Sequence, residues 1–385
     1  MPDSSIHNQP IFIVGSPRSG TSILTWSLGQ HPNLLGLEES NWMTSFAVDT
    51  AVAFRRGSAR GERSQFSSMG MQRDQFMRDI GACINESIRS HRHIFEDRLT
   101  QLATPGGPED HAAFKITRDQ SDPKSRWVNG TPGYSFGITG LRKLFPAARF
   151  IHLVRDCDLV VASMLNFDRV AGTRLVETEE EGYRRWLACV RACVAAENAF
   201  GAEVVCRIFH EDLAGEPETA IRKILDFIGE PFASSCLEPL TKRINSSKVE
   251  TGETKREPPA HPALIHEARE LWRTLKENPS PARPIAEAAT LAEEQFERRV
   301  KYIHELDAQC SRTQRAHKKL RDEFTERTEW ALRLSKENAE MRKQIVGLQE
   351  EFSERTKWAL SLADEVAQKD VQILRLQREF EKRTG

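Results

Sequence analysis

The 385-residue sequence lacks both long apolar runs and a marked excess of charge of one sign. No segment approaches the roughly 18 to 20 consecutive apolar residues of a membrane-spanning helix, and the start MPDSSIHNQP shows no basic and apolar leader pattern. Because 55 Lys and Arg nearly balance 56 Asp and Glu, no global field favours nucleic acid or an anionic membrane as partner. We therefore expect a cytoplasmic protein without a membrane span, in which any anion site is local.

Cysteine pairs of the redox or zinc-binding type are also missing. The seven cysteines include no C-x-x-C motif, and an odd number does not favour a disulfide framework. Cys189 and Cys193 lie one helical turn apart, a spacing open to a metal pair or, as we favour, to ordinary helix packing. We expect reduced thiols and no resident metal ion.

Short β-rich runs alternate with helical patterns over the first two thirds of the chain. The predicted strands are IFIV at 11–14, WVN at 127–129, RFIHLV at 149–154 and EVVCRIF at 203–209. This alternation is typical of βαβ units. It predicts an α/β domain over residues 9–262, with a P-loop-type parallel sheet flanked by helices, and then a helical linker over 263–295. The polar stretch 55–70, the helical pattern after it and the loop TPGGPEDH form an insertion that is open to two interpretations, a lid or acceptor pocket and a simple surface excursion.

Proline is absent beyond Pro284, where the composition changes to Glu, Arg, Lys, Leu and Gln. Positions spaced by seven from Phe296 are candidate a positions of a heptad. The d positions three residues further on include Leu306, Leu320, Leu334, Met341, Leu348, Leu362 and Leu376. Because this seam lasts far beyond three or four heptads, it predicts a long α-helical coiled coil over 296–385.

The coiled-coil region repeats itself every four heptads. EFTERTEWAL begins at Glu323, EFSERTKWAL at Glu351 and EFEKRT at Glu379. Arginines at d positions recur with the same period and weaken the seam, whereas Asn338 at an a position sets register and favours a parallel dimer. We expect a homodimer or a complex with a partner protein. The alternative is a single solvated helix folded back on the α/β domain.

A tight turn follows the first predicted strand. The segment GSPRSGTS at residues 15–22 leads into the helical pattern ILTWSLGQ, and such a turn offers backbone N–H groups and the positive helix end to an anion. Its spacing matches G-x-x-x-x-G-K-[ST], but Thr21 replaces the lysine that reaches the β- and γ-phosphates of a nucleotide. This departure argues against a kinase. Arg18 is expected to supply the charge for a single phosphate or sulfate group.

The loop PRSGTS resembles the 5′-phosphosulfate loop of the sulfotransferase family that uses 3′-phosphoadenosine 5′-phosphosulfate (PAPS). A second segment, FIHLVRDCDLVVASM, is similar to the family's 3′-phosphate element, in which an arginine ends a strand and a serine follows; here these are Arg155 and Ser163. The resemblance implies PAPS as donor, no metal, and a donor site formed by Arg18, Ser19, Gly20, Thr21, Ser22, Arg155 and Ser163. A salt bridge from Arg155 to Asp156 or Asp158 is the structural alternative.

The stretch RSGTSILTWSLGQHPNLLGLEES is similar to tyrosylprotein sulfotransferases, whose catalytic glutamate falls on Glu39. Glycan N-sulfotransferases show a comparable Glu-Glu pair followed by an aromatic patch, which Trp42 supplies here. The resemblance implies that Glu39 is the general base and that Arg18 neutralises the leaving group. Glu38 and His31 are the alternative bases. The remaining candidates His111, His152 and His210 are expected to be structural.

The family pattern is interrupted at Gly130. Related enzymes often carry a lysine there, before the Thr-Pro pair, to neutralise the leaving group. Arg18 would then carry more of that charge, unless it comes from Lys115, Arg118 or Lys124.

The sequence therefore predicts a PAPS-dependent sulfotransferase acting on a hydroxyl or amine of a glycan, a protein or a small molecule. Two alternatives remain: an inactive head on a coiled-coil interaction protein, and a P-loop small-molecule kinase.

Overall fold

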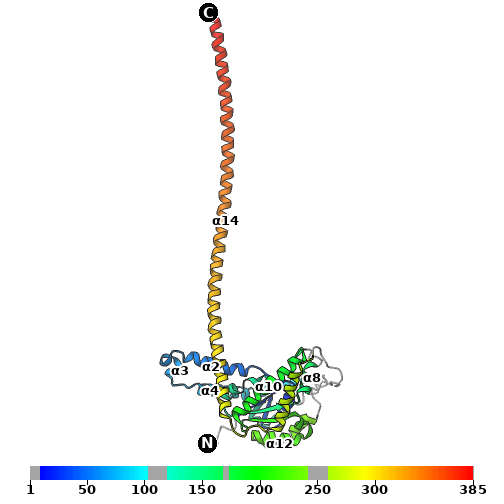
Figure 1. Ribbon diagram of the computed structural model, residues 1–385. Coiled ribbons are helices and arrows are strands. Elements are labelled where there is room, and N and C mark those ends of the chain that lie inside the picture. The colour runs from blue at the N-terminus through cyan, green and yellow to red at the C-terminus, as the bar shows by residue number, and fades with distance from the viewer. Residues whose placement is uncertain (1–8, 103–118, 168–172, 242–258, 385) are drawn as a thin grey trace. The chain divides into compact units, whose positions relative to one another are not determined.

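The computed structural model describes residues 9–102, 119–167, 173–241 and 259–384. Within these residues a five-stranded parallel sheet has helices on both faces, and a long helix forms the C-terminal part (Figure 1). The strands, in the spatial order β2-β3-β1-β4-β5, are β1 (Ile11–Gly15), β2 (Leu34–Leu37), β3 (Arg126–Asn129), β4 (Arg149–Val154) and β5 (Val205–Phe209). The predicted α/β class is confirmed.

Strand β2 is absent from the predicted set. Its sequence, LLGL, is a short apolar run close behind a helical pattern, and such a run cannot be told from a helix end by periodicity. It pairs in parallel with β3, from Leu34 opposite Arg126 to Leu37 opposite Asn129. Glu38 and Glu39 follow directly, so β2 carries both carboxylates to the carboxyl edge of the sheet.

Alternate residues of the central strand point to opposite faces. Phe12 and Val14 lie in one apolar cluster, and Ile11 and Ile13 lie in the other. The first face is covered by α2 (Met43–Gly57), α4 (Arg73–Ser90), α7 (Ile138–Leu144) and α10 (Glu179–Phe200). The second is covered by α1 (Thr21–Gly29), α12 (Pro217–Ile228) and η4 (Ser234–Thr241). Because both faces are buried, the central strand β1 is a continuous apolar run.

A third apolar cluster joins α8 (Cys157–Leu165), α10 and α13 (Pro262–Glu277). Cys189 and Cys193 are both buried in the packed face of α10, and burial raises the pKa of the Cys189 thiol to about 11. Within the described ranges, no group of three or more His, Cys, Asp or Glu side chains is arranged to hold a metal ion. The two cysteines act as packing residues.

The other elements of the described chain are η2 (Gly61–Arg63), α3 (Gln65–Ser68), α5 (Arg92–Leu102), η3 (Pro132–Phe136), α11 (His210–Gly215) and α14 (Ala286–Thr384). The polar stretch 55–70 thus contains the end of α2, η2 and α3. The rings of Phe54, Phe66 and Phe76 lie 5.1 to 5.8 Å apart and pin it to α4. In this structure the stretch is a packed excursion of the surface.

The chain divides into two compact units, Met1–Glu305, called the head below, and Leu306–Gly385, called the tail. The head includes α13 and the first turns of α14. Phe296 and Val300 are buried in its core, and Lys143 binds Glu293 at 2.9 Å. The segment predicted as a linker therefore packs on the α/β domain, because α13 supplies apolar side chains to the third cluster. Phe296, the first predicted a residue, packs on the first face of the sheet.

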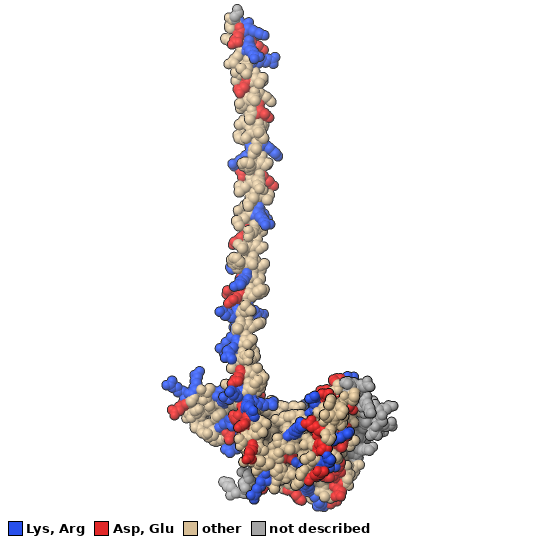
Figure 2. All heavy atoms as spheres, viewed as in Figure 1, with Lys and Arg blue, Asp and Glu red and all other residues tan. Residues whose placement is uncertain are grey.

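The tail is one continuous helix up to Thr384. Figure 2 shows Lys and Arg together with Asp and Glu along it, except that residues 308–321 carry basic side chains and no acidic ones. Among the helices that the structure describes, none combines the length and the apolar character needed to cross a membrane. The helix is observed, while its pairing into a coiled coil stays a prediction.

Candidate active site

The turn between β1 and α1 is strained and polar. Arg18 has a φ of 69° and Gly20, the N-cap of α1, has a φ of 101°; a non-glycine residue in the left-handed region costs roughly 1–3 kcal/mol and often marks a functional site. No side chain caps α1, so the N–H groups of its first turn are available to a ligand. The buried Oγ of Ser19 has no hydrogen-bond partner in the described structure. A bound anion would satisfy these donors.

Strand β4 delivers the second predicted element to the same turn. Gly15 of β1 is paired with Leu153 of β4, so the loops that leave these two strands meet. Arg18 Nε donates to Ser163 Oγ at 3.1 Å, and Arg155 Nη1 donates to the Arg18 carbonyl oxygen at 3.0 Å. Segments far apart in the sequence therefore form one cluster.

Two guanidinium groups are partly buried in this cluster. Burial and the charge of Arg155 lower the pKa of Arg18, against the influence of Glu39. Burial also lowers the pKa of Arg155, against the influence of Glu211 and Asp156. Arg155 Nε is buried and has no partner among the described residues. Two desolvated cations, with the Nε of Arg155 as a spare donor, form a site suited to a highly charged anion.

The two carboxylates predicted as alternative partners of Arg155 are engaged elsewhere. Asp156 accepts from the Leu159 N–H at 3.0 Å and caps α8. Asp158 binds Arg269 at 2.9 Å and accepts from the Tyr183 hydroxyl at 2.7 Å. The structural alternative for Arg155 is therefore not supported.

Glu39 contacts the anion-binding turn. Ser22 Oγ donates to Glu39 Oε1 at 2.9 Å. Partial burial raises the pKa of Glu39; the Ser22 hydrogen bond and Arg18 lower it, and Glu38 raises it further, with a net increase. Glu39 is nonetheless an exposed residue. A carboxylate of raised pKa that an acceptor can reach is able to take a proton from it.

The backbone on both sides of Glu39 is tied to the end of β3. Asn129 Nδ2 donates to the Glu38 carbonyl oxygen at 2.9 Å, and the Ser40 N–H donates to Thr131 Oγ1 at 2.8 Å. Ser40 Oγ also lies 2.9 Å from the Tyr134 hydroxyl. These bonds hold the Glu39 backbone in place beside α1.

Gly130 leaves no room for the lysine of the family pattern. A Cβ at this position would lie 2.1 Å from Thr25 Oγ1 and 2.9 Å from the Thr21 carbonyl oxygen. Thr25 is held there, since its hydroxyl donates to that same carbonyl at 2.9 Å. The close approach of β3 to α1 therefore explains the departure sterically.

Of the predicted substitutes for that lysine, Lys124 is the one that the structure describes, and it is engaged away from the turn. Lys124 is buried and donates to the carbonyl oxygens of Gly29 and His31 at 2.8 and 2.7 Å, which caps the C-terminal end of α1. Lys115 and Arg118 lie outside the described residues.

His31 is a structural residue. Its Nδ1 accepts from the Asn33 N–H at 3.1 Å, so Nε2 donates to the Pro231 carbonyl oxygen at 2.9 Å. Burial lowers the pKa of His31. With both ring nitrogens engaged away from the turn, it is not placed to act as base.

His210, expected to be structural, lies against the anion-binding turn. A Cβ on Gly20 would come within 2.9 Å of its Cδ2. Burial and the charge of Arg155 lower the pKa of His210 to about 4, so the ring is neutral near neutral pH. The signal that could have found it is its position directly after β5, at the sheet edge where ligands bind.

An exposed aromatic pair begins α2, close in sequence to Glu39. The rings of Trp42 and Phe46 meet edge to face, with centroids 5.6 Å apart, and the two residues are 44% and 36% exposed. Phe136 of η3 is also exposed. Exposed aromatic rings of this kind are suited to contact with a bound molecule.

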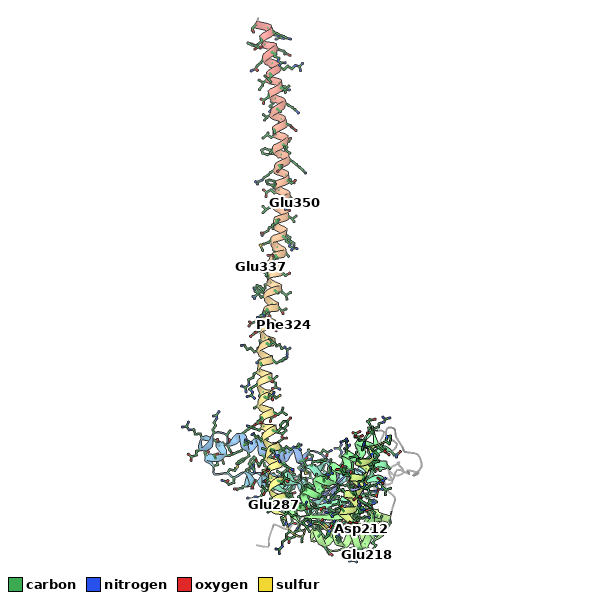
Figure 3. All side chains as sticks on the ribbon, in the orientation of Figure 1. Asp212, Glu218, Glu287, Phe324, Glu337 and Glu350 are labelled. Carbon is green, nitrogen blue, oxygen red and sulfur yellow. The ribbon has the colours of Figure 1, made fainter. Side chains whose placement is uncertain are left out.

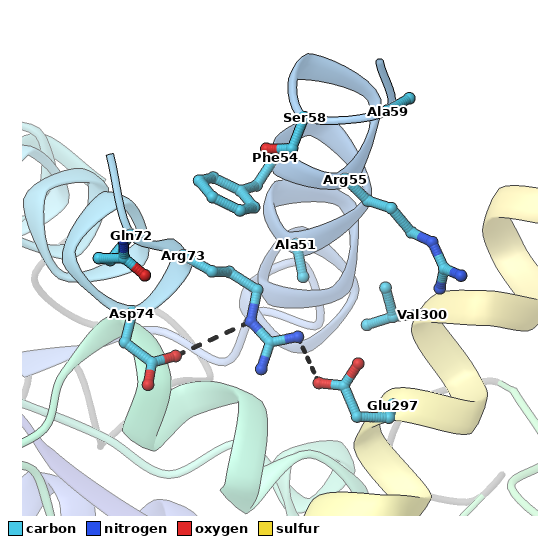
Figure 4. A pocket seen from close by; sticks show the side chains of 10 residues that line it. All are labelled: Ala51, Phe54, Arg55, Ser58, Ala59, Gln72, Arg73, Asp74, Glu297 and Val300. Atoms are coloured by element: carbon cyan, nitrogen blue, oxygen red, sulfur yellow. Dashed lines mark hydrogen bonds and ion pairs between the residues drawn. The ribbon is translucent and has the colours of Figure 1, made fainter. Parts of the chain in front are cut away.

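A cavity of about 510 Å³ lies elsewhere in the head, between α2, α4 and the first turns of α14 (Figure 4). Arg73 in its wall is ion-paired with Glu297 and Asp74. None of the predicted site residues lines it. We assign it no chemistry.

Comparisons with known proteins place this geometry in context. A family model described as "Sulfotransferase family" matches residues 10–234. Protein-tyrosine sulfotransferase A of Caenorhabditis elegans is 22% identical over 243 residues, which are 62% of this chain and 56% of that protein. Protein-tyrosine sulfotransferase 1 of Danio rerio is 24% identical over 232 residues, 59% and 55% of the two chains. This chain thus spans just over half the length of these two relatives.

A solved structure is similar as well. The sulfotransferase domain of the olefin synthase from Synechococcus PCC 7002 is 24% identical, with 74% of this chain and 94% of that chain covered and a TM-score of 0.36. All the predicted site residues, from Arg18 to Ser163, lie within the region that the family model matches.

Proposed function

Since this chain belongs to the sulfotransferase family, we propose that it moves a sulfuryl group from PAPS to a hydroxyl or amine of an acceptor, with Glu39 as general base. The observation that carries the proposal is the hydrogen bond from Ser22 to Glu39. It joins a carboxylate of raised pKa to the turn that offers its N–H groups to an anion. Base and anion site are thus neighbours, as in-line transfer requires.

The residues of the cluster fit the two anionic ends of PAPS. The first turn of α1, with Ser19, Thr21 and Ser22, would hold the 5′-phosphosulfate, and Arg155 with Ser163 would hold the 3′-phosphate. Arg18 lies between them through its bond to Ser163. The unpaired donors Ser19 Oγ and Arg155 Nε support this assignment, and neutral His210 adds a polar group beside Gly20.

When bound, PAPS supplies the sulfuryl group, and the protein activates the acceptor and stabilises the leaving group. Glu39 Oε2 accepts the proton of the acceptor, because Oε1 is engaged by Ser22. The sulfur–acceptor bond forms as the bond from sulfur to the phosphate oxygen breaks. Arg18 and the N–H groups of α1 stabilise the charge that builds on that oxygen.

We propose a large acceptor, a protein or a glycan. The relatives are named protein-tyrosine sulfotransferases, which makes a tyrosine-containing peptide the first acceptor to test. The exposed rings of Trp42 and Phe46 suit contact with either a phenol or a sugar ring. An amino-polysaccharide and a simple phenol complete the test panel.

Thermal unfolding of the full chain, titrated with adenosine 3′,5′-bisphosphate and separately with ATP, tests the donor site. A ligand of the folded state stabilises it by about 2.7 kcal/mol at a hundredfold excess over Kd. We expect a rise in the head's melting temperature with the bisphosphate. The rise should vanish in Arg155→Ala and persist in Arg269→Ala, a matched change of an exposed arginine.

The other outcomes discriminate between the alternatives. Stabilisation by ATP alone would overturn the proposal in favour of a kinase. No stabilisation by either nucleotide would favour an inactive head on an interaction protein.

A further inference from the structure

The tail carries an apolar stripe that no described part of the chain covers. Its apolar a and d residues remain between 41% (Leu334) and 74% (Phe352) exposed, and Phe324 projects from the bare helix (Figure 3). These residues are Leu306, Leu320, Phe324, Leu334, Met341, Ile345, Leu348, Phe352, Leu362, Val366, Ile373, Leu376 and Phe380. A stripe of this period is buried when a second helix supercoils around the first.

The residue types along the stripe specify two parallel strands. Ile345 is followed by Leu348, and Ile373 by Leu376, so that β-branched residues lie at a and leucine at d, the combination that favours parallel dimers. Two a residues are polar, His317 and Asn338, and Asn338 lies near the centre of the stripe. In a parallel, in-register pair it faces the same asparagine, whereas a shift by one four-heptad repeat would set it against Val366.

Charges beside Asn338 are complementary in the same arrangement. Glu337 at g faces Arg342 at e of a second copy, and neither has an ion pair within the described chain. Glu337, labelled in Figure 3, is an exposed residue of this helix. One like-charged pair, Glu365 with Asp370, opposes this register, but Lys369 lies between them and binds Glu365 at 3.8 Å.

The large and small residues of the repeat also fit a second copy. Each a residue inserts into a hole formed by four residues of the facing helix, including the preceding g residue. Ala331 and Ala359 are small a residues, and each follows a largely exposed tryptophan at g, Trp330 or Trp358. The indole of one copy fills the space that the alanine of the other leaves.

We propose that residues 306–384 pair with the same segment of a second copy of this chain as a parallel, in-register, two-stranded coiled coil. Arg355 at d is compatible with this pairing, because it is ion-paired with Glu351 one turn earlier in its own helix. The proposal rests on the tail alone and does not depend on the sulfotransferase assignment.

Cys310 provides a native reporter, since it occupies an a position and its thiol is exposed. In the proposed pair the two Cys310 residues face each other, so mild oxidation of the full chain should give a covalent dimer on a non-reducing gel. The dimer should persist in Cys83→Ser, which removes an exposed cysteine of the head, and disappear in Cys310→Ser.

The far end of the stripe distinguishes parallel from antiparallel pairing. In the Cys310→Ser background, Leu376→Cys at d should restore the cross-link, whereas Val371→Cys, at the outward f position, should not. A cross-link at Cys310 without one for Leu376→Cys would overturn the in-register parallel arrangement.

Sedimentation equilibrium of the full chain measures the stoichiometry. We expect twice the 43.8 kDa chain mass. Asn338→Ile should raise the melting temperature of the tail and broaden the mass distribution toward larger oligomers, because the buried asparagine specifies two strands at a cost in stability. A monomer at micromolar concentration, or a trimer, would overturn the proposal.

Discussion

The head and the tail both carry sequence signals, but of different kinds. In the head, single residues from motifs that occur once, Arg18, Glu39 and Arg155, leave three strand ends and meet at one turn. In the tail, the same residue types recur every four heptads. Chemistry therefore depends on individual positions in the head, whereas association depends on a period in the tail.

The two regions also differ in how their charges are solvated. Arg126 and Glu230 in the head are buried and 2.7 Å apart, and breaking such a pair typically costs about 3–5 kcal/mol. In the tail, Lys319 and Glu323 are exposed and 3.9 Å apart, and such pairs are worth at most about 1 kcal/mol. Single substitutions should thus have large effects in the head and small effects in the tail.

The largest effect is expected at Glu39. Glu39→Gln should lower kcat by about 10²- to 10⁴-fold, the usual contribution of a general base, with the affinity for adenosine 3′,5′-bisphosphate unchanged. The measurement is transfer from labelled PAPS to the acceptor that the panel identifies, with bisphosphate affinity determined in parallel.

Glu38→Gln is the matched control, and we expect its kcat to fall by less than about tenfold. Because the pKa of Glu39 is raised and the base must be ionised, the rate of the native protein should fall with decreasing pH from above the usual glutamate range. The residual rate of Glu39→Gln should not show this fall at low pH. If kcat fell equally in Glu39→Gln and Glu38→Gln, Glu39 would not be the general base.

The next largest effect is expected in the buried network of Glu197. Its carboxylate accepts from His152 Nδ1 at 2.5 Å and from Arg207 Nε at 3.1 Å. Burial alone would raise the pKa of Glu197, but these partners outweigh it and lower the pKa to about 2. Glu197→Gln leaves Arg207 without its carboxylate and should lower the free energy of unfolding by about 3–5 kcal/mol.

The sign of the pH dependence follows from the lowered pKa. Stability from Glu197 is fully present above the unfolded carboxyl pKa of 4.5 and is lost as pH falls toward about 2. The difference between native protein and Glu197→Gln in urea unfolding should therefore shrink between about pH 7 and about pH 3.5. Glu267→Gln, in an exposed pair with Arg191, should cost less than about 1 kcal/mol throughout. If the difference in unfolding free energy between the native protein and Glu197→Gln did not change with pH, Glu197 would not be ionised in this network.

The sequence pattern predicted four strands and the positions of Arg18 and Arg155, because both depend on residues that are contiguous in the chain. A strand, a turn and a helix N-terminus are contiguous, so the positions of Arg18 and Arg155 at the sheet edge follow from their own segments. Strand β2 could not be predicted, because its four residues carry no period of their own and form a strand only by pairing with β3.

Contacts between distant segments were beyond the sequence pattern. His210 approaches Gly20 only because β5 lies two strands away from β1 in the same sheet. The sequence shows that Gly130 departs from the family pattern, which has a lysine there. The cause is the nearby hydroxyl of Thr25, and this tertiary contact is not visible in the sequence. The sequence pattern also did not predict that Phe296 is buried in the head, because Phe296 fits the heptad pattern as well as the a residues of the tail do.

A pair of glycines gives the smallest and sharpest contrast between the two regions. Gly130→Ala should destabilise the head by about 1–3 kcal/mol, because the added Cβ overlaps Thr25 Oγ1. Gly347→Ala should stabilise the tail by roughly 0.5–1 kcal/mol, since nothing lies within 4 Å of the added Cβ and alanine is the better helix former. Separate urea transitions of head and tail measure both effects. Thr25→Ala should rescue part of the Gly130→Ala loss by removing the hydroxyl. Without that rescue, crowding by Thr25 would not be the reason for glycine at position 130.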